Sequence, residues 1–316
     1  MLDAMSSQGA TCVFHGVGKT YRTLIRRRAV RAVEGFSLEI PTGEVFGIAG
    51  PNGAGKSTLI NLLLGFVGPT LGTVSINGER PRVFIESRGV GYLSELVAIP
   101  PGWTVDGALR RYALLARIRR PERRTRIDAA VVQLGLEEHR GKKVRQLSKG
   151  NLQRLGLAQA LMSDSDLVVL DEPTHGFDPV WTARFRDIGR SLKRPGRTVI
   201  IASHNLDELE RVADRVGIID QGRLQHVAEM GRSSSATLAD YRLVVQETEP
   251  TVPGVFPAAL RVADGRVGEY RVPQVDLATL NEGLRRLLAG GTRLVAVVPI
   301  HSQLESTFRE VVRERP

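Results

Sequence analysis

A glycine-rich loop with one lysine and two hydroxyl side chains is the strongest chemical feature of the sequence. This phosphate loop fits the pattern GxxxxGK[ST] and consists of Gly50, Pro51, Asn52, Gly53, Ala54, Gly55, Lys56, Ser57 and Thr58. Its glycines allow backbone N–H groups to converge on phosphate oxygens at a helix N-terminus, where the helix dipole favours an anion. Lys56 would reach the β- and γ-phosphates, and the Ser57 hydroxyl would bind Mg²⁺. The loop therefore predicts a nucleotide site.

An acidic pair follows a second apolar segment. The sequence Leu-Val-Val-Leu at 167–170 leads directly into Asp171 and Glu172. A buried strand would deliver Asp171 to its carboxyl end, where the carboxylate can hold Mg²⁺ through water. Glu172 would then orient and deprotonate an attacking water molecule. Together with the phosphate loop, this pair predicts hydrolysis of a nucleoside triphosphate.

The elements that must position these residues alternate along the chain. The apolar strand EVFGIAG precedes the phosphate loop, and the helical segment LINLLLGF follows it. Beyond residue 145 helices and buried strands alternate again, which favours a parallel-type sheet covered by helices. Residues 104–140 change to helical periodicity and form a helical insertion, with Pro121 opening the second helix. Residues 10–50 read as short strands and turns.

A pentapeptide before the helical segment LQRLGLAQAL identifies the kind of nucleotide-binding protein. Leu-Ser-Lys-Gly-Asn at 147–151 resembles the signature of the ATP-binding cassette (ABC) family, usually written LSGGQ. The resemblance extends from about residue 12 to 225. It implies an α/β fold of the P-loop NTPase class, with a RecA-like core, an antiparallel β subdomain and a helical insertion. In the family, the signature contacts the γ-phosphate bound to the opposite subunit, so that two cassettes sandwich two ATP molecules.

Ser148 and Gly150 are the signature residues that the resemblance assigns to ATP. Ser148 offers a hydroxyl and Gly150 a bare N–H at a helix N-terminus, which is an anion-binding arrangement. A serine that only caps a helix is the alternative interpretation.

The resemblance also assigns four further positions. Tyr21 is expected to stack on adenine, Glu95 to sense Mg²⁺ and couple to a membrane subunit, Asp178 to bridge the two cassettes, and His204 to contact the γ-phosphate. The alternatives are a packed core tyrosine at 21, a surface glutamate at 95 and a structural histidine at 204.

Three residues depart from the usual family pattern. Lys149 and Asn151 replace Gly and Gln in the signature, and Glu95 replaces Gln. Lys149 and Glu95 resemble the subgroup that serves exporters with type-2 permeases. Asn151 is the least expected residue and could weaken signature contacts across the dimer. The terminal SQLESTFREVV resembles the closing helix found after many such cassettes, and a stabilising appendage is the alternative there.

The chain is expected to hold two domains. A cassette is predicted over residues 10–230, with a helical subdomain at about 95–160. A composition change at GRSSSATL places a linker at 231–240. Residues 241–316 read as a small α+β accessory domain.

Composition excludes several classes of protein. With 42% apolar and 25% charged residues in 316, the chain can build a core, so disorder of the whole chain is excluded. A single cysteine, Cys12, excludes an intramolecular disulfide framework and a cysteine-built zinc site.

The formal net charge is +10, and much of the excess lies in one segment. This arginine window, residues 110–126, contains eight arginines and one acid. It is either a solvated face or a surface near anionic lipid headgroups. Its single aromatic residue, Tyr112, argues against a stacking platform for single-stranded nucleic acid.

The sequence contains no apolar segment near the roughly 20 residues that a spanning helix needs. We therefore expect an ATPase with ATP and Mg²⁺ as cofactors, located at the cytoplasmic face of the membrane through an integral membrane permease. A second cassette, in a homodimer, is the expected partner, and nucleic acid is not. The alternatives are a soluble ABC-type ATPase acting on nucleic acid or ribosomes, and a regulatory cassette that binds ATP without turnover.

Overall fold

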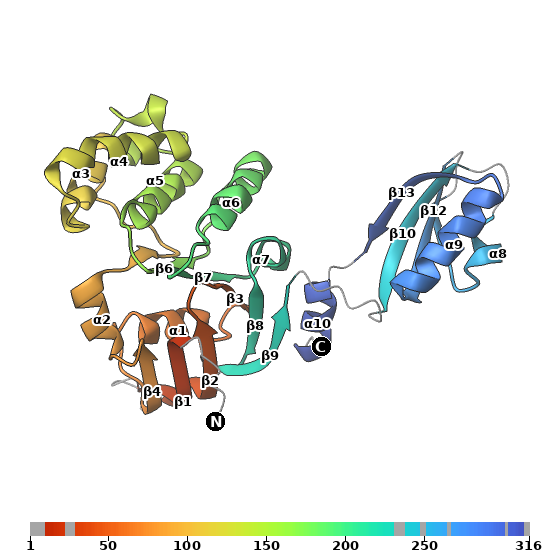
Figure 1. Cartoon of the computed structure of the whole chain (residues 1–316), viewed down its shortest axis with the longest axis horizontal. Coiled ribbons are helices and arrows are strands. Elements are labelled where there is room, and N and C mark those ends of the chain that lie inside the picture. The colour runs from red at the N-terminus through yellow and green to blue at the C-terminus, as the bar shows by residue number, and fades with distance from the viewer. Residues whose placement is uncertain are drawn as a thin grey trace, which may run out of the picture. The chain divides into compact units, whose positions relative to one another are not determined.

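The computed structural model describes residues 10–22, 29–230, 238–246, 251–263, 267–300 and 303–312. The chain divides into two compact units, residues 1–230 and 231–316 (Figure 1).

A six-stranded sheet organises the first unit. Its strand order is β5-β6-β7-β3-β8-β9, and every neighbouring pair is parallel except β8 and β9. The three central strands are buried along their whole length, as expected for parallel strands covered on both faces. The strands are β3 (Val45–Ala49), β5 (Gly91–Leu93), β6 (Leu167–Asp171), β7 (Thr198–Ser203), β8 (Arg215–Asp220) and β9 (Arg223–Glu229).

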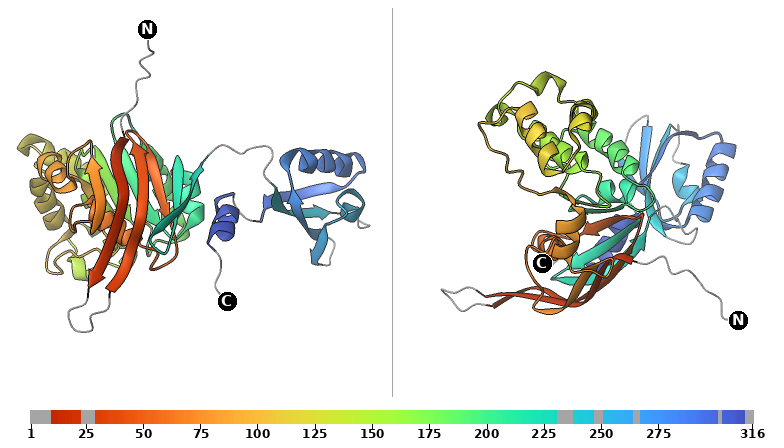
Figure 2. Two further views of the ribbon diagram at one scale, coloured as in Figure 1. Left: turned by 90° about the horizontal axis from the view of Figure 1, so that it is seen from below. Right: turned by 60° about the vertical axis from the view of Figure 1, so that its left-hand side comes forward.

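A second, antiparallel sheet of three strands lies beside the first one, with its long strands in the foreground on the left of Figure 2. Its order is β2-β1-β4, from β2 (Ala29–Pro41), β1 (Ala10–Arg22) and β4 (Leu71–Ile76). Helix α1 (Lys56–Leu63) contacts strands of both sheets. Apolar side chains from the two sheets and α1 form one core, so the phosphate loop that opens α1 is held by both sheets.

Three helices form a separate cluster within the first unit (Figure 1). These are α3 (Val105–Leu115), α4 (Arg120–Gln133) and α5 (Lys149–Met162), which contact one another. Helix α5 also packs on β5. The remaining helical segments are α2 (Pro81–Arg88), η1 (Glu137–His139), η2 (Val144–Gln146), α6 (Pro179–Ser191) and α7 (Leu206–Val212).

The second unit is a four-stranded antiparallel sheet with helices. Its order is β11-β12-β10-β13, and its own core includes Leu243, Phe256 and Tyr270. Its elements are β10 (Ala239–Gln246), α8 (Val252–Val255), β11 (Leu260–Ala263), β12 (Val267–Val275), α9 (Leu277–Ala289), β13 (Arg293–Pro299) and α10 (Gln303–Val311). The predicted linker 231–240 overlaps the start of β10, and its residues 231–237 lie outside the described residues.

The predicted α/β fold class is confirmed. Helix α2 and strand β9 were not predicted from the sequence, and β1 and β2, with 13 residues each, are longer than the short strands expected within residues 10–50. Gly16, with φ of +56°, lies at a register shift within β1, so the chain can bend there and continue pairing. Among the described residues, we find no helix that is both long and apolar enough to cross a membrane.

Candidate functional site

The phosphate loop joins the buried end of β3 to α1. Gly55 has φ of +108°, and a Cβ atom there would lie 2.7 Å from the Ala32 carbonyl oxygen. A Cβ at Gly50 would lie 2.4 Å from the Ile219 carbonyl oxygen. A side chain at either position would collide with a backbone carbonyl oxygen. The loop can therefore adopt this conformation only with glycine at positions 50 and 55.

Lys56 is buried at the start of α1. Its Nζ donates to the carbonyl oxygens of Gly50, at 2.6 Å, and Pro51, at 3.3 Å. Burial lowers the pKa of Lys56, and the charges of Glu172, Asp171 and Glu95 oppose that shift. The ammonium group is therefore surrounded by carbonyl and carboxylate groups, where it can also meet phosphate oxygens.

Asp171 is the last residue of β6 and is 4% exposed. Burial raises its pKa to about 7, with the charges of Glu95 and Glu172 adding to the shift and Lys56 opposing it. Three carboxylates thus share a site with one lysine. An excess of buried negative charge of this kind is stabilised by a cation.

Glu172 has an unusual backbone conformation, with φ of +48°. Its carboxylate accepts hydrogen bonds from the His204 backbone N–H at 3.0 Å and the Ser203 hydroxyl at 3.3 Å, and His204 Nδ1 lies 2.8 Å from Oε2. The left-handed conformation of a non-glycine residue costs about 1–3 kcal/mol, and it recurs at functional sites. The structure thus brings Glu172 and His204 together.

Gln153, which the sequence analysis did not single out, touches the same region. Its Nε2 donates to the carbonyl oxygens of Glu172 at 3.0 Å and Pro173 at 3.3 Å. Its side chain is buried. A glutamine on the apolar face of a helix could have indicated a buried polar side chain. Which face of α5 is buried, however, depends on the tertiary structure.

The signature residues lie at the N-terminus of α5. Ser148 is the N-cap, exposed, and its Oγ accepts from the Asn151 N–H at 3.2 Å. A Cβ at Gly150 would lie 2.8 Å from the Gly176 carbonyl oxygen, so glycine permits the close approach of the loop that follows β6. The cap is present, and the exposed hydroxyl oxygen also remains accessible to a ligand.

Asn151 is engaged within its own chain. Its Nδ2 lies 2.9 Å from His139 Nε2, and its Oδ1 accepts a hydrogen bond from Arg154 Nη2. The amide thus links α5 to η1. The departure from the usual signature glutamine therefore has an intramolecular role in this structure.

Asp178 is the exposed N-cap of α6, and its Oδ1 accepts from the Trp181 N–H at 2.8 Å. The Trp181 ring lies under two guanidinium groups, those of Arg154 at 4.0 Å and Arg184 at 4.7 Å. These contacts connect the start of α6 to the signature helix α5.

Tyr21 and Glu95 are less closely tied to this site. Tyr21 is 38% exposed near the end of β1, with the Lys19 ammonium 5.1 Å from its ring centroid, so it is not a packed core tyrosine. Glu95 is exposed, yet its charge acts on both Lys56 and Asp171. No interaction in the described part of the chain joins Tyr21, Ser148 or Asp178 to Lys56.

The side chains fit Mg²⁺ bound together with a phosphorylated ligand. Within the described residues, no cluster of three or more histidine, cysteine or acidic side chains has the geometry to hold a metal by itself. Mg²⁺ commonly keeps several waters and binds through one or two carboxylates plus substrate phosphates. Ser57 of the phosphate loop, Asp171 and Glu95 supply that kind of incomplete oxygen set.

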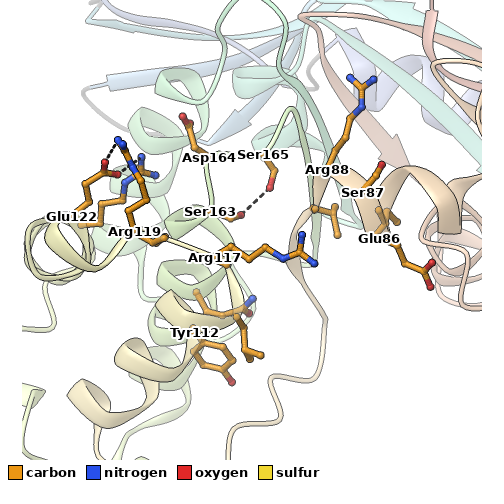
Figure 3. Close-up of a pocket in the computed structure, with 18 residues that line it drawn as sticks. Glu86, Ser87, Arg88, Tyr112, Arg117, Arg119, Glu122, Ser163, Asp164 and Ser165 are labelled. Carbon is orange, nitrogen blue, oxygen red and sulfur yellow. Dashed lines mark hydrogen bonds and ion pairs between the residues drawn. The ribbon is translucent and has the colours of Figure 1, made fainter.

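A groove with many arginines lies away from these residues (Figure 3). Its volume is about 850 Å³. It runs between the end of α2, the connection from α3 to α4, and the end of α5. Arg119 and Arg126 both pair with Glu122 on its wall, and Leu115 on its lining is 76% exposed.

Comparison with known proteins places these features in one family. The ABC transporter family matches residues 33–175. An uncharacterised ABC transporter ATP-binding protein of Synechocystis sp. is 34% identical over 310 residues, covering 95% of this chain and 84% of that protein. One from Nostoc sp. is 40% identical over 211 residues, covering 65% of this chain and 62% of that protein. This chain thus spans less than two thirds of the Nostoc relative.

Relatives named for the transport of particular compounds are also similar. A bacitracin transport ATP-binding protein of Bacillus licheniformis is 36% identical over 201 residues, covering 61% of this chain and 63% of that protein. A methionine import ATP-binding protein of Thermobifida fusca is 34% identical over 216 residues, covering 66% of each. Among solved structures, a dimeric bacterial ABC transporter cassette has a TM-score of 0.64 at 24% identity, covering 70% of this chain and 99% of that one.

Proposed function

This chain belongs to the ABC transporter family as an ATP-binding ATPase subunit that uses ATP and Mg²⁺, and we propose that it powers export by a separately encoded membrane permease. ATP binding would close two copies of the cassette, and hydrolysis would reopen them. The observation that carries the hydrolytic part of the proposal is the placement of Glu172 against His204, in the acidic site that also holds Asp171 and Lys56.

The phosphate loop is the proposed ATP site. The loop N–H groups of Gly50–Thr58 and the Lys56 ammonium would bind the phosphates, with Tyr21 stacking on adenine. Ser57, Asp171 and Glu95 would hold Mg²⁺, which supplies neutralisation of the phosphate charge when bound. The pKa of Asp171, raised to about 7 by burial and by neighbouring carboxylates, supports a cation there, since a cation would favour the ionised form.

Glu172 is the proposed general base. Its carboxylate would accept the proton of the attacking water, while the His204 backbone N–H and the Ser203 hydroxyl hold that carboxylate in place. The His204 side chain is 64% exposed to solvent. Its ring could therefore turn toward the γ-phosphate without losing buried contacts.

A second copy of the cassette is the proposed partner across ATP. Cassettes of this family dimerise and partner with membrane permease subunits. Ser148, Gly150 and Asp178 are the proposed contacts to the other copy. Ser148 and Asp178 are exposed at helix N-termini, where the dipole favours a phosphate or another anion.

Export, rather than import, is favoured by residues of this chain. Lys149 in the signature and Glu95 resemble the pattern of cassettes that serve type-2 permeases, and a small α+β unit follows the cassette. The relatives named for bacitracin transport and methionine import leave the direction open, so the proposal rests on those residues.

The arginine-lined groove is the proposed contact with the permease, at the cytoplasmic face of the membrane. It combines the exposed apolar side chain of Leu115 with arginines, among which Arg117 points into the open space of the groove (Figure 3). A short amphipathic helix with acidic residues would match both features. The rest of the arginine window would then lie near anionic headgroups, at about 1 kcal/mol per residue close to the surface.

Hydrolysis is tested by Glu172→Gln in the purified full chain. We expect phosphate release to fall about 100- to 10,000-fold while ATP affinity changes less than threefold, because the amide cannot accept the proton. Glu210→Gln on α7 is the matched control, with turnover like the unmodified chain. Turnover of Glu172→Gln at the unmodified rate would exclude Glu172 as the base.

The permease contact is tested by affinity purification from detergent-solubilised membranes. We expect a multispanning membrane protein to co-purify with two copies of the chain, and Leu115→Asp to abolish the association. Leu260→Asp, at an exposed leucine of the second unit (62%), should leave it intact. Co-purification with ribosomes or nucleic acid in place of a membrane protein would overturn the proposal.

A further inference from the structure

A buried side chain of the signature helix reaches the backbone of the proposed base. Gln153 is 5% exposed, and its Nε2 lies 3.0 Å from the Glu172 carbonyl oxygen and 3.3 Å from that of Pro173. These two carbonyls belong to the first two residues after β6, where the loop toward α6 begins. One amide group therefore holds two successive peptide units.

The position of those peptide units sets the direction of the Glu172 side chain. With φ of +48°, Glu172 leaves the β6 direction sharply, and its N–H donates to the Ala202 carbonyl at 2.9 Å. Its carbonyl accepts from both Gln153 and the His175 N–H, the latter at 3.1 Å. A left-handed residue persists only where its surroundings over-determine it. Gln153 supplies one of those restraints from a different helix.

The same helix begins at the signature. Helix α5 is continuous from Lys149 to Met162, with Ser148 as its N-cap, so Gln153 and the cap move together if the helix moves. A Cβ at Gly156 would lie 2.9 Å from the Leu93 side chain, so α5 also packs closely on β5. One side chain thus links the helix that carries the signature to the Glu172 carbonyl.

We propose that Gln153 is a positioning residue that couples the signature helix to the orientation of Glu172. The proposal rests on the role of Glu172 as base proposed above. Gln153 does not touch the reacting atoms. It fixes the 172–173 backbone so that the carboxylate stays against His204 and faces the phosphate loop, and it releases that backbone when α5 moves away.

Two nearly isosteric substitutions in the full chain separate the hydrogen bonds from the shape. Gln153→Met keeps the volume and removes both donor hydrogens, so we expect kcat to fall about tenfold with KM for ATP unchanged within twofold. Gln133→Met, on an exposed turn of α4, is the matched control and should leave kcat unchanged. A kcat of Gln153→Met within twofold of the unmodified chain, or a parallel rise in KM, would overturn the proposal.

Gln153→Glu provides a second readout that a purely structural role would not give. An ionised glutamate would face two carbonyl oxygens, whereas its protonated form has an O–H that can donate. We expect its kcat, relative to the unmodified chain, to rise as pH falls from 8.5 to 6. A ratio that is constant across this range would contradict the proposal, even if Gln153→Met proves unstable.

A double-mutant cycle keeps this proposal distinct from the role of Glu172. In a Glu172→Gln background, Gln153→Met should lower the residual turnover less than twofold, because the residue it positions no longer acts as a base. Additive losses would overturn the coupling while leaving Glu172 as base. Unmodified turnover in Glu172→Gln alone would instead overturn the base assignment.

Discussion

At the carboxyl end of the central sheet, the residues Lys56, Asp171 and Glu172 are buried, whereas Ser148 and Asp178 are exposed to solvent at helix N-termini. The buried residues interact with one another through charge, and Glu172 also accepts hydrogen bonds from Ser203 and His204. The exposed residues accept a bond from their own helix. The buried side is preorganised within one chain, and the exposed side is available to a second molecule.

Burying the Asp171 carboxylate among other acidic groups lowers the free energy of unfolding, and this effect can be measured. In the nucleotide-free chain with a chelator, burial and nearby carboxylates raise the pKa of Asp171 to about 7 from its ordinary 3.8. Between these values the folded chain holds a proton that the unfolded chain has released, so stability falls as pH rises through this window. Asp171→Asn should therefore stabilise the chain progressively from pH 4 to 7, by up to about 4 kcal/mol, and no further above.

Urea unfolding at pH 5, 6, 7 and 8 measures this effect. Asp187→Asn, at an exposed position on α6, is the control and should shift stability by less than about 0.5 kcal/mol at every pH. A stabilisation by Asp171→Asn that does not change with pH would show that the carboxylate is not buried among like charges.

Removing Lys56 from the buried side should lower turnover nearly as much as Glu172→Gln does. Lys56→Ala deletes the proposed contact to the β- and γ-phosphates and leaves the carboxylates of Asp171 and Glu172 uncompensated. We expect phosphate release to fall about 100-fold, measured at saturating ATP, with weaker ATP binding. The exposed Lys142→Ala is the control. Turnover within fivefold of the unmodified chain would place the phosphates elsewhere.

On the exposed side, Ser148→Asp distinguishes a helix cap from an ATP contact. Aspartate caps helices as well as serine and suits the helix dipole, so the melting temperature should stay within about 2 °C. Its negative charge would repel the γ-phosphate held by the other copy. We expect ATP-dependent dimerisation of a Glu172→Gln chain, followed by light scattering, to weaken at least tenfold. Unchanged dimerisation would mean that Ser148 is a cap alone.

The smallest effect is expected in the arginine window, which is exposed like the signature. Arg120→Gln should weaken binding of the chain to vesicles containing anionic lipid about fivefold at low salt, since each basic residue near the surface contributes about 1 kcal/mol. Arg293→Gln, exposed in the second unit, is the control. Equal losses for the two variants would indicate general attraction by net charge, and no loss would indicate a solvated face.

The sequence predicted best the parts of the site that depend on local chain geometry. The phosphate loop works through consecutive residues between one strand and one helix, and Asp171 follows a strand that is buried on both faces. The α/β class follows from the same alternation. These features require no knowledge of which helix packs on which sheet.

The parts that escaped prediction depend on contacts between distant segments. Gln153 becomes significant because α5 packs where β6 ends, and Asn151 because η1 lies beside α5. The left-handed φ of Glu172 could not be predicted from the residue type, because glutamate rarely adopts this conformation. Helix α2 was missed because its polar segment PRVFIESR buries Phe84 alone.

The stacking of Trp181 between two arginines has a spectroscopic consequence. The indole lies three residues after Asp178 and contacts the guanidinium of Arg154 from α5, so its emission senses whether the signature helix and α6 keep their spacing. The chain has one other tryptophan, Trp103, which stacks with Arg111. A Trp103→Phe chain would thus carry a single native tryptophan, placed to record any change in the spacing of α5 and α6 without a label.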